Sequence, residues 1–360
     1  MPPSEHSLRR LRLAAGLAGE KLDALIVSAL PNIRYLTGFT GSNALLLVHP
    51  DTAILFTDPR YAIQAAEETD CRLRIARGPL PNLLLSILKR KPVKTVGFEK
   101  SRIPYDLWES LDKDLPSRTR LKPAVGLVEQ LRAVKSPIEI ASIRRSVEIL
   151  CQAFAAALPT IRHGIREFEL AAELDHQMRL LGADQPAFET IVASGPRSAL
   201  PHARPTSKTL DYNELLLMDM GAHHAGFASD MTRMAFLGRP SPQASLLVGA
   251  VRQAQAAAVA SVRPGVKASA VDRTARDVLK TAGLDRLFTH STGHGLGLEV
   301  HESPRIGKRE KTPLQAGMVV TIEPGVYMKG FGGVRIEDTV LVTETGCEVL
   351  TTTPKELLEI

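Results

Sequence analysis

The chain of 360 residues has few cysteines, few aromatic residues and no long apolar run. Its three cysteines, Cys71, Cys151 and Cys347, are odd in number and far apart, which excludes a disulfide framework and the spacing of a structural zinc site. No run approaches the roughly 18 apolar residues of a membrane span. The apolar piece near the start is short and runs into Glu20, unlike a signal peptide. We therefore expect a cytoplasmic protein with reduced thiols and no membrane partner.

Neither sign of charge is in large excess. Lys and Arg number 45 against 39 Asp and Glu, a net charge of +6. The basic runs are short, and with 4% aromatic residues in the chain no stacking side chains accompany them. This excludes nucleic acid as an expected partner. The 44% hydrophobic content and the length predict a globular protein of two domains.

The pattern of elements changes near residue 130. Before it, short strands alternate with helices, the pattern of an α/β domain. After it, Ser136-Pro137 with Glu139 marks the start of a long helix. The order helix, helix, strands then occurs twice, which predicts an α+β domain with a two-fold internal repeat. We expect an N-terminal domain over residues 1–130 and a second domain over residues 131–360.

The segment from Glu214 to Leu237 is predicted to be a hairpin with its turn at 223–226. A turn centred between residues 224 and 225 places Asp219 directly opposite Asp230, with Cβ atoms roughly 5 Å apart. A single acid is most often solvated, but Asp219 lies inside an apolar strand, where a carboxylate needs a partner. Two opposed like charges therefore predict a positive group between them.

A second hairpin is predicted around Gly330. The same symmetry places Glu323 opposite Glu337, unless a bulge shifts the register. Glu323 also lies inside an apolar run, TIEPG. Two hairpins that each present two carboxylates predict one shared site.

Between the hairpins, HSTGHGLGLEVHE holds His290, His294 and His301. Its glycines argue against a helix, and therefore against the helical HExxH zinc motif. Four carboxylates with a histidine suit two divalent ions, and oxygen-rich ligation favours Mn²⁺. From spacing alone, the sequence predicts a dinuclear metallohydrolase.

These motifs resemble those of the pita-bread metallopeptidases (M24). The motifs MDMG, SDMTR, TGHGLGLEVHE, TIEPG and VRIED look like the metal quintet of the aminopeptidase P and prolidase branch, and NIRYLTGFTGS looks like its N-terminal domain. The resemblance covers nearly the whole chain. It implies a creatinase/prolidase-like α/β domain followed by a pita-bread catalytic domain with a pseudo-two-fold repeat.

The resemblance also implies a metal site. Asp219 and Asp230 would bind one metal ion, and His294 and Glu323 the other. Asp230 and Glu337 would bridge the two ions. The ions would be Mn, with Co or Zn as alternatives. Glu323 would also handle the proton of the attacking water.

Further roles follow from the same resemblance. His202 and His301 match catalytic positions that contact the substrate carbonyl, and His290 and Arg335 match substrate-binding positions. Simpler alternatives stay open, since His202 could be an ordinary loop histidine and Arg335 a counterion for the carboxylates.

The implied activity is hydrolysis of Xaa-Pro bonds at the N-terminus of small peptides with proline at the second position, as in aminopeptidase P, by a homodimer. One alternative is an Xaa-Pro dipeptidase (prolidase), in which Arg309 would bind the free carboxylate of the substrate. A non-catalytic pita-bread binding protein is a second alternative. A third, methionine aminopeptidase, is disfavoured by the extra N-terminal domain.

Overall fold

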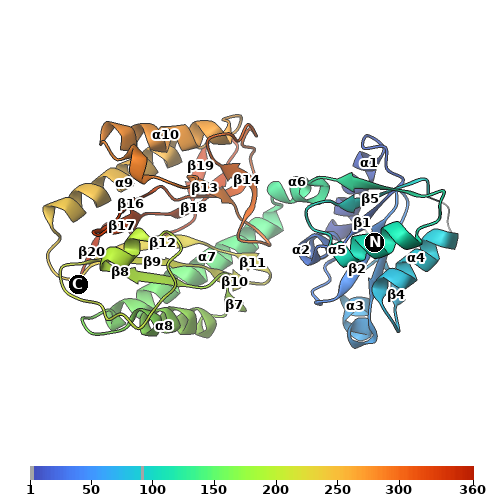
Figure 1. Cartoon of the computed structure of the whole chain (residues 1–360), viewed down its shortest axis with the longest axis horizontal. Helices are drawn as coiled ribbons and strands as arrows, with labels where there is room; N and C mark the ends of the chain where they lie inside the picture. Colours follow the sequence, from blue (N-terminus) through green and yellow to red (C-terminus); the bar gives the residue numbers. More distant parts are fainter. Residues whose placement is uncertain (1–3, 91–92) are drawn as a thin grey trace. The chain divides into compact units, whose positions relative to one another are not determined.

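The computed structural model describes residues 4–90 and 93–360. The chain forms two compact units, Met1–Arg132 and Ala133–Ile360, each with its own sheets and helices (Figure 1). Each unit is described by itself below.

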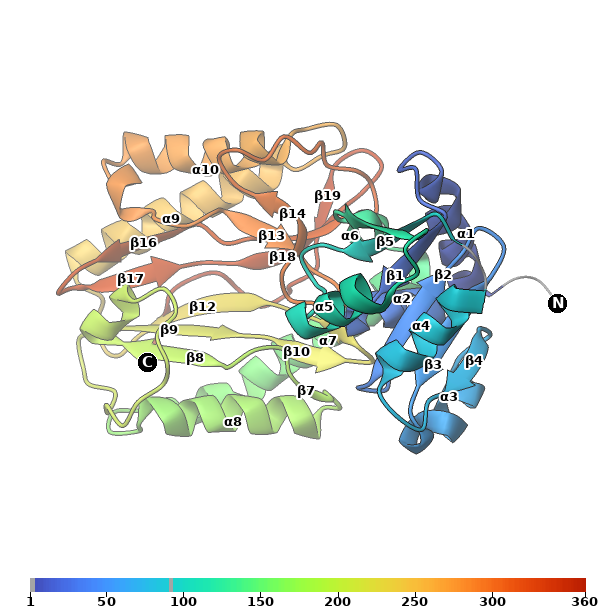
Figure 2. The ribbon, with the colours of Figure 1, turned by 45° about the vertical axis from the view of Figure 1, so that its right-hand side comes forward.

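The first unit is built on a six-stranded sheet of order β4-β3-β2-β1-β5-β6 (Figure 2). β1 pairs antiparallel with β2 and parallel with β5. The strands are β1 (Ala24–Val27), β2 (Ala44–Val48), β3 (Ala53–Thr57), β4 (Arg72–Ile75), β5 (Thr95–Glu99) and β6 (Arg120–Ala124). The helices are α1 (Glu5–Leu17), α2 (Leu30–Thr37), α3 (Ala62–Glu68), α4 (Leu80–Arg90) and α5 (Tyr105–Asp114), and α6 (Leu127–Ala133) follows the last strand. The predicted α/β character is confirmed.

The second unit repeats one order of elements. Helices α7 (Pro137–Ala157) and α8 (Glu167–Leu180) precede the first group of strands, and α9 (Pro242–Ser261) and α10 (Ala268–Thr281) precede the second. The first group contains β7 (Gln185–Pro186), β8 (Ile191–Ser194), β9 (Leu215–Met220), β10 (Ala222–His224), β11 (Phe227–Ala228) and β12 (Met231–Phe236). The second contains β13 (Gly293–Gly295), β14 (Glu302–Ile306), β15 (Val319–Ile322), β16 (Gly325–Met328), β17 (Gly332–Arg335), β18 (Asp338–Val342), β19 (Cys347–Val349) and β20 (Leu358–Glu359).

The strands of this unit lie between the two helix pairs, with α9 and α10 on one side and α7 and α8 on the other (Figure 1). Successive residues of β9 therefore enter different cores. Leu215 and Leu217 join the core under α9 and α10, whereas Leu216 and Met218 join the core under α7 and α8. Because side chains alternate along a strand, Asp219 falls on the side of Leu215 and Leu217. Burial of both faces explains the continuous apolar run around Asp219.

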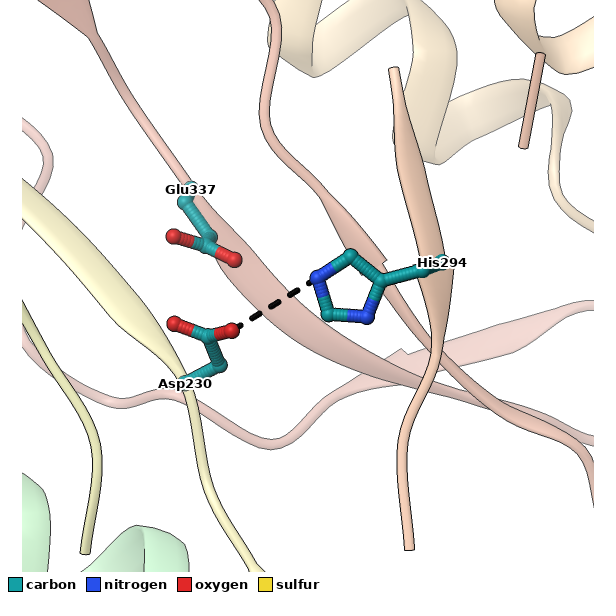
Figure 3. Close-up of side chains that lie close together, drawn as sticks. All are labelled: Asp230, His294 and Glu337. Carbon is teal, nitrogen blue, oxygen red and sulfur yellow. Dashed lines mark ion pairs between the residues drawn. The ribbon is translucent and has the colours of Figure 1, made fainter. Parts of the chain in front are cut away.

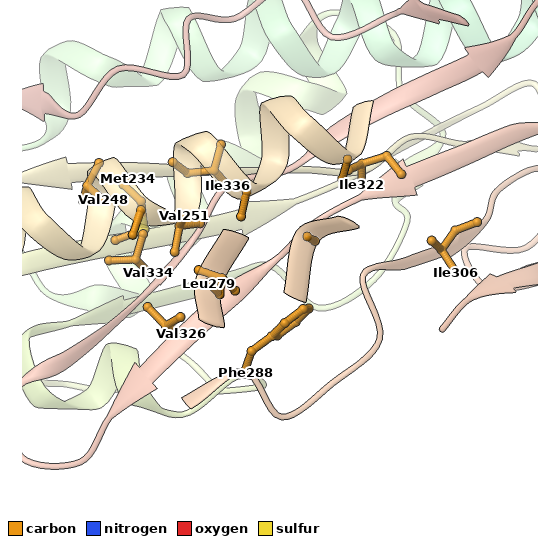
Figure 4. Close-up of a cluster of buried hydrophobic side chains, with 14 of the residues drawn as sticks. Met234, Val248, Val251, Leu279, Phe288, Ile306, Ile322, Val326, Val334 and Ile336 are labelled. Carbon is orange, nitrogen blue, oxygen red and sulfur yellow. The ribbon is translucent and has the colours of Figure 1, made fainter. Parts of the chain in front are cut away.

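Figure 4 shows the core on the α9 and α10 side, where Val251 of α9 and Leu279 of α10 lie beside the strands that carry Ile322 and Val334. All four of these side chains are fully buried. Close packing of this kind fixes the strands, and with them any side chain that the strands present.

The long helix α7 begins where the sequence predicts. Ser136 accepts a hydrogen bond from the Glu139 N–H, the Glu139 carboxylate accepts one from the Ser136 N–H, and Pro137 occupies the first turn. This capping box satisfies two amide donors that the helix cannot bond itself.

The register of the first acidic hairpin differs from the prediction. Asp219 pairs with Thr232, so Asp230 lies two residues back along its strand, diagonal to Asp219 and not directly opposite it. The turn lies at Ala225 and Gly226, and both have positive φ, 50° and 86°, as a type I′ turn requires. The shift amounts to two residues, so the two carboxylates still share one face.

The predicted register of the second hairpin is confirmed. Gly325 pairs with Arg335 on one side of the acidic pair, and Ile322 pairs with Asp338 on the other. These pairs place Glu323 opposite Glu337, and the turn lies around Gly330, as the sequence indicates.

All three cysteines are free. Within the described ranges, no helix combines the length and the apolar character that crossing a membrane requires.

Candidate metal centre

The predicted ligands lie on strands of the second unit or directly beside them. Asp219 lies on β9 and Asp230 directly precedes β12. His294 is the middle residue of β13, Glu323 lies between β15 and β16, and Glu337 lies between β17 and β18. Residues 290–302 form no helix, as the glycines indicate.

Three of these side chains converge from separate strands (Figure 3). One ligand atom from each of Asp230, His294 and Glu337 lies within 4.8 Å of the others. The Nε2 atom of His294 is 3.6 Å from Asp230 Oδ2 and 3.4 Å from Glu323 Oε1. Glu323 therefore reaches the same histidine nitrogen as Asp230.

Asp219 lies outside this cluster and faces the same cleft. Its Oδ2 accepts a short hydrogen bond from Arg335 Nη2, while its buried Oδ1 meets no hydrogen-bond donor among the described residues. Glu337 repeats this pattern, since Oε2 accepts from Thr232 Oγ1 at 2.7 Å and the buried Oε1 meets no donor in the described ranges. A buried polar atom without a partner is costly, so both atoms call for a ligand.

The charges of the site also favour the binding of a cation. Burial, with repulsion from neighbouring carboxylates, raises the pKa of Asp230 and of Glu337 well above the usual range. Burial also raises the pKa of Glu323 to about 7, although Arg335 opposes the shift. One guanidinium cannot neutralise four carboxylates, so the cluster lacks positive charge.

Divalent cations fit this donor set. Buried oxygen atoms without partners, mutual repulsion and a histidine nitrogen in their midst are what a cation would relieve. Burial lowers the pKa of His294, which keeps the imidazole neutral and able to act as a ligand.

The five residues line a cleft of about 650 Å³. The same cleft contains His202, His290, His301 and Arg335, so the structure brings together the predicted metal, catalytic and substrate-binding residues, with the exception of Arg309. The rings of His294 and His301 are 4.3 Å apart between centroids. Burial lowers the pKa of His301, which favours the neutral ring.

His290 and Arg335 are held inside the protein wall. Arg335 Nη1 donates to Tyr327 Oη at 2.8 Å, and His290 Nε2 is 2.8 Å from the same oxygen. Arg335 also donates to Asp219, to Thr232 Oγ1 and to the Pro201 carbonyl. Burial lowers the pKa of His290 to about 4, so this ring is neutral.

Two side chains that bond the predicted residues were not predicted, Thr232 and Tyr327. Thr232 bonds both Glu337 and Arg335, and Tyr327 joins His290 to Arg335. The register of Asp219 against Thr232 is the signal that could have found the threonine. Tyr327 carries no such signal, because a tyrosine in a strand is usually a core residue.

Of the two arginines Arg305 and Arg309, Arg305 lines the metal cleft and Arg309 does not. Arg309 lines a neighbouring pocket of about 380 Å³, which shares His290, Ser291 and Arg305 with the metal cleft. Arg305 Nε donates to Ser291 Oγ at 2.8 Å. Its two terminal nitrogens form no hydrogen bond with any described residue.

Comparisons with known proteins identify the family of the chain. Residues 141–344 match the model described as metallopeptidase family M24, and residues 9–134 match that of the creatinase/prolidase N-terminal domain. The chain is therefore a hydrolase of the metallopeptidase class. It belongs to metallopeptidase family M24, whose members depend on a dinuclear metal centre. The predicted family and fold are confirmed.

Relatives with named activities cover nearly the full length. An Xaa-Pro dipeptidase of Pyrococcus horikoshii is 36% identical over 338 residues, 94% of this chain and 95% of the relative. The structure of an Xaa-Pro dipeptidase from Bacillus anthracis has a TM-score of 0.96 at 34% identity and covers 99% of this chain and 100% of its own. An X-Pro aminopeptidase from Thermotoga maritima has a TM-score of 0.88 at 36% identity, covering 94% and 98%.

Proposed function

We propose that the protein is an Xaa-Pro dipeptidase. This is the alternative in our sequence analysis, and it replaces the aminopeptidase P activity that we first favoured. Relatives named Xaa-Pro dipeptidase dominate the comparisons. The observation that carries the proposal is Arg305, whose terminal nitrogens are available in the wall of the metal cleft.

The dipeptide proposal follows from the chemistry of that arginine. A dipeptide carries its free carboxylate on the residue after the scissile bond, so the cleft must hold an anion close to the metal ligands. A guanidinium binds a carboxylate through two parallel hydrogen bonds. An aminopeptidase would instead need open space beyond the proline.

The metal centre would be held by the predicted five ligands. We propose that Asp219 and Asp230 hold one divalent ion and His294 and Glu323 the other, with Asp230 and Glu337 between them. When bound, such ions supply Lewis-acid activation of water and of the scissile carbonyl. Mn²⁺ suits the oxygen-rich donor set.

The side chains of the cleft would complete the chemistry. Glu323, which lies in the cleft beside His294, would accept the proton of the attacking water and pass it to the leaving proline nitrogen. His202 and His301 would donate hydrogen bonds to the substrate carbonyl oxygen as negative charge develops on it. Arg335, with Tyr327 and His290 behind it, would hold Asp219 in place, as a counterion and not as a substrate ligand.

The test compares substrates that differ only in the carboxylate. The Mn²⁺-loaded protein should cleave Gly-Pro faster than Gly-Pro-amide and Gly-Pro-Ala. Arg305→Met should lower kcat/KM for Gly-Pro about 10- to 100-fold, the loss expected for hydrogen bonds to a charged group. It should change the cleavage of the amide little, because the amide carries no charge for the arginine to bind.

Arg309→Met is the matched control and should leave kcat/KM for Gly-Pro unchanged. Preferred cleavage of Gly-Pro-Ala by the unmodified protein would instead support an aminopeptidase. An equal effect of Arg305→Met on both Gly-Pro and its amide would remove the proposed role of Arg305.

A further inference from the structure

The loop that carries His202 is long and its histidine is not anchored by its own side chain. Residues 195–214 join β8 to β9. The His202 side chain is exposed to the cleft and makes no hydrogen bond with any described residue. Its position must therefore come from the backbone on either side of it.

A buried carboxylate joins the chain on the two sides of His202. Glu167, the first residue of α8, has a side chain that is 0% exposed. Its Oε1 accepts hydrogen bonds from Ser194 N and Ser194 Oγ, at 2.9 and 3.1 Å. Its Oε2 accepts from Thr206 N and Thr206 Oγ1, at 3.0 and 2.7 Å. One side chain thus closes the segment from residue 194 to residue 206.

Arg197 extends this link to the neighbourhood of the histidine. Its Nε donates to both oxygens of Glu167, at 3.2 and 3.0 Å, and its Nη2 donates to the Arg204 carbonyl at 2.6 Å. On the other side of His202, Arg335 donates to the Pro201 carbonyl. The peptide groups that flank His202 are therefore held by two arginines, one paired with Glu167 and the other with Asp219.

We infer that Glu167 is a positioning residue for His202, which it holds at the cleft through Arg197 and through its bonds to Ser194 and Thr206. This inference rests on the proposed function, in which His202 donates to the substrate carbonyl. A displacement of about 1 Å in such a donor is enough to cost about 100-fold in rate.

The test uses Glu167→Gln in the metal-loaded, full-length protein. The substitution keeps the shape of the side chain but replaces one carboxylate oxygen with an NH₂ group. This group cannot accept the hydrogen bonds that Thr206 and Arg197 donate. We expect kcat for Gly-Pro to fall about 10- to 100-fold, with KM changed less than about threefold and metal content unchanged. Glu169→Gln is the matched control, because Glu169 lies on the same helix turn, bonds Arg166 and is 39% exposed. It should leave kcat unchanged.

A double variant separates positioning from general damage. If Glu167 acts through His202, then Glu167→Gln should cause no further loss in a His202→Ala background. Additive losses would overturn the inference, as would full activity of Glu167→Gln. Should Glu167→Gln fail to fold, Thr206→Val carries the same test. It removes the 2.7 Å hydroxyl bond to Glu167 and a 3.2 Å bond that the same oxygen accepts from the Lys208 N–H, while the Thr206 N–H still bonds Glu167.

A readout independent of activity distinguishes this inference from the proposed function. The His202 ring signal in a proton–carbon NMR spectrum, assigned with His202→Ala, should shift or broaden in Glu167→Gln and stay in place in Glu169→Gln. An unchanged signal would overturn the inference even if the protein cleaves Gly-Pro. A shifted signal in a protein that cleaves no Xaa-Pro peptide would support the positioning of His202 and remove only the proposed function.

Discussion

Two buried carboxylates, Glu337 and Asp338, lie side by side at the start of β18 and differ in how many hydrogen bonds the protein donates to them. Glu337 belongs to the metal centre, where one of its oxygens has no donor among the described residues. Its neighbour Asp338 accepts four hydrogen bonds, from Arg233 and Thr351 on Oδ1 and from Gln255 and Lys355 on Oδ2. Adjacent residues of a strand point to opposite faces, so one chain segment serves both groups.

The pKa values follow the same division. Burial alone would raise the pKa of both groups. For Asp338, Arg233 and Lys355 reverse the effect and the pKa is lowered, whereas for Glu337 the nearby Glu323 and Asp219 add to it. A buried carboxylate whose oxygens all accept hydrogen bonds contributes to the fold. One that lacks donors and lies among like charges indicates a cation site.

The largest effect is expected for Glu337→Gln. This variant should lower kcat of the metal-loaded protein by about 10³-fold or more, since several kcal/mol of charge stabilisation depend on the metal centre. The melting temperature of the metal-free variant should not fall below that of the metal-free wild type, because a buried like charge has been removed. Activity assays and calorimetry with and without EDTA measure the two effects. An active Glu337→Gln protein would contradict the assignment of this carboxylate to the centre.

Asp338→Asn should reverse that pattern. It leaves Arg233 and Lys355 without their carboxylate, and breaking a buried pair costs about 3–5 kcal/mol of unfolding free energy. Urea unfolding of the metal-free protein measures it. A loss below about 1 kcal/mol would remove the distinction between the two carboxylates, since substitutions of exposed residues change the unfolding free energy by a similar amount.

The second hairpin shows what the sequence contains. Glu323 and Glu337 are equidistant from Gly330, and a regular hairpin keeps that symmetry, so the pairing was predicted correctly. In the first hairpin, Ala225 takes a positive φ of 50°, which is uncommon for a residue with a side chain. The turn centre was therefore placed too early, and the prediction that Asp219 faces Asp230 directly was wrong.

Other parts depend on contacts between distant segments. In the first unit the sequence analysis missed the helix Leu30–Thr37. The helix ends at Gly38, whose φ of 82° is typical of a residue that ends a helix. Arg305 and Arg309 differ by only four residues, and both lie in one basic segment. Only the folded chain shows which of them enters the cleft, because β14 carries Arg305 beside Ser291 while Arg309 lies beyond the strand.

Acidity gives the third way to test the comparison. The pKa of Glu323 in the folded, metal-free protein is about 7, against 4.5 for an ordinary glutamate. A raised pKa stabilises the folded protein at low pH, and this contribution is lost as the pH rises from about 4.5 to 7. The metal-free protein should therefore lose up to about 3 kcal/mol of stability from this group between pH 5 and pH 8.

Other groups titrate in the same range, among them His290, whose lowered pKa acts in the opposite direction. The difference in unfolding free energy between wild type and Glu323→Gln isolates the glutamate, measured in urea with EDTA at both pH values. A constant difference would show that Glu323 is charged throughout and that burial does not raise its pKa.

The smallest effect tests whether burial or pairing separates the two kinds of carboxylate. Arg144 and Glu348 form two parallel hydrogen bonds, both 2.6 Å, as good in geometry as the bonds around Asp338. Their side chains, however, are 43% and 46% exposed. Exposed pairs contribute about 0–1 kcal/mol, because water already solvates both partners and salt screens their attraction. Arg144→Gln should therefore lower the unfolding free energy in urea by less than about 1 kcal/mol, and high salt should reduce the difference further. A loss as large as that of Asp338→Asn would contradict the role of burial. It would mean that the geometry of the ion pair, and not burial of the carboxylate, sets the unfolding free energy lost when the pair is broken.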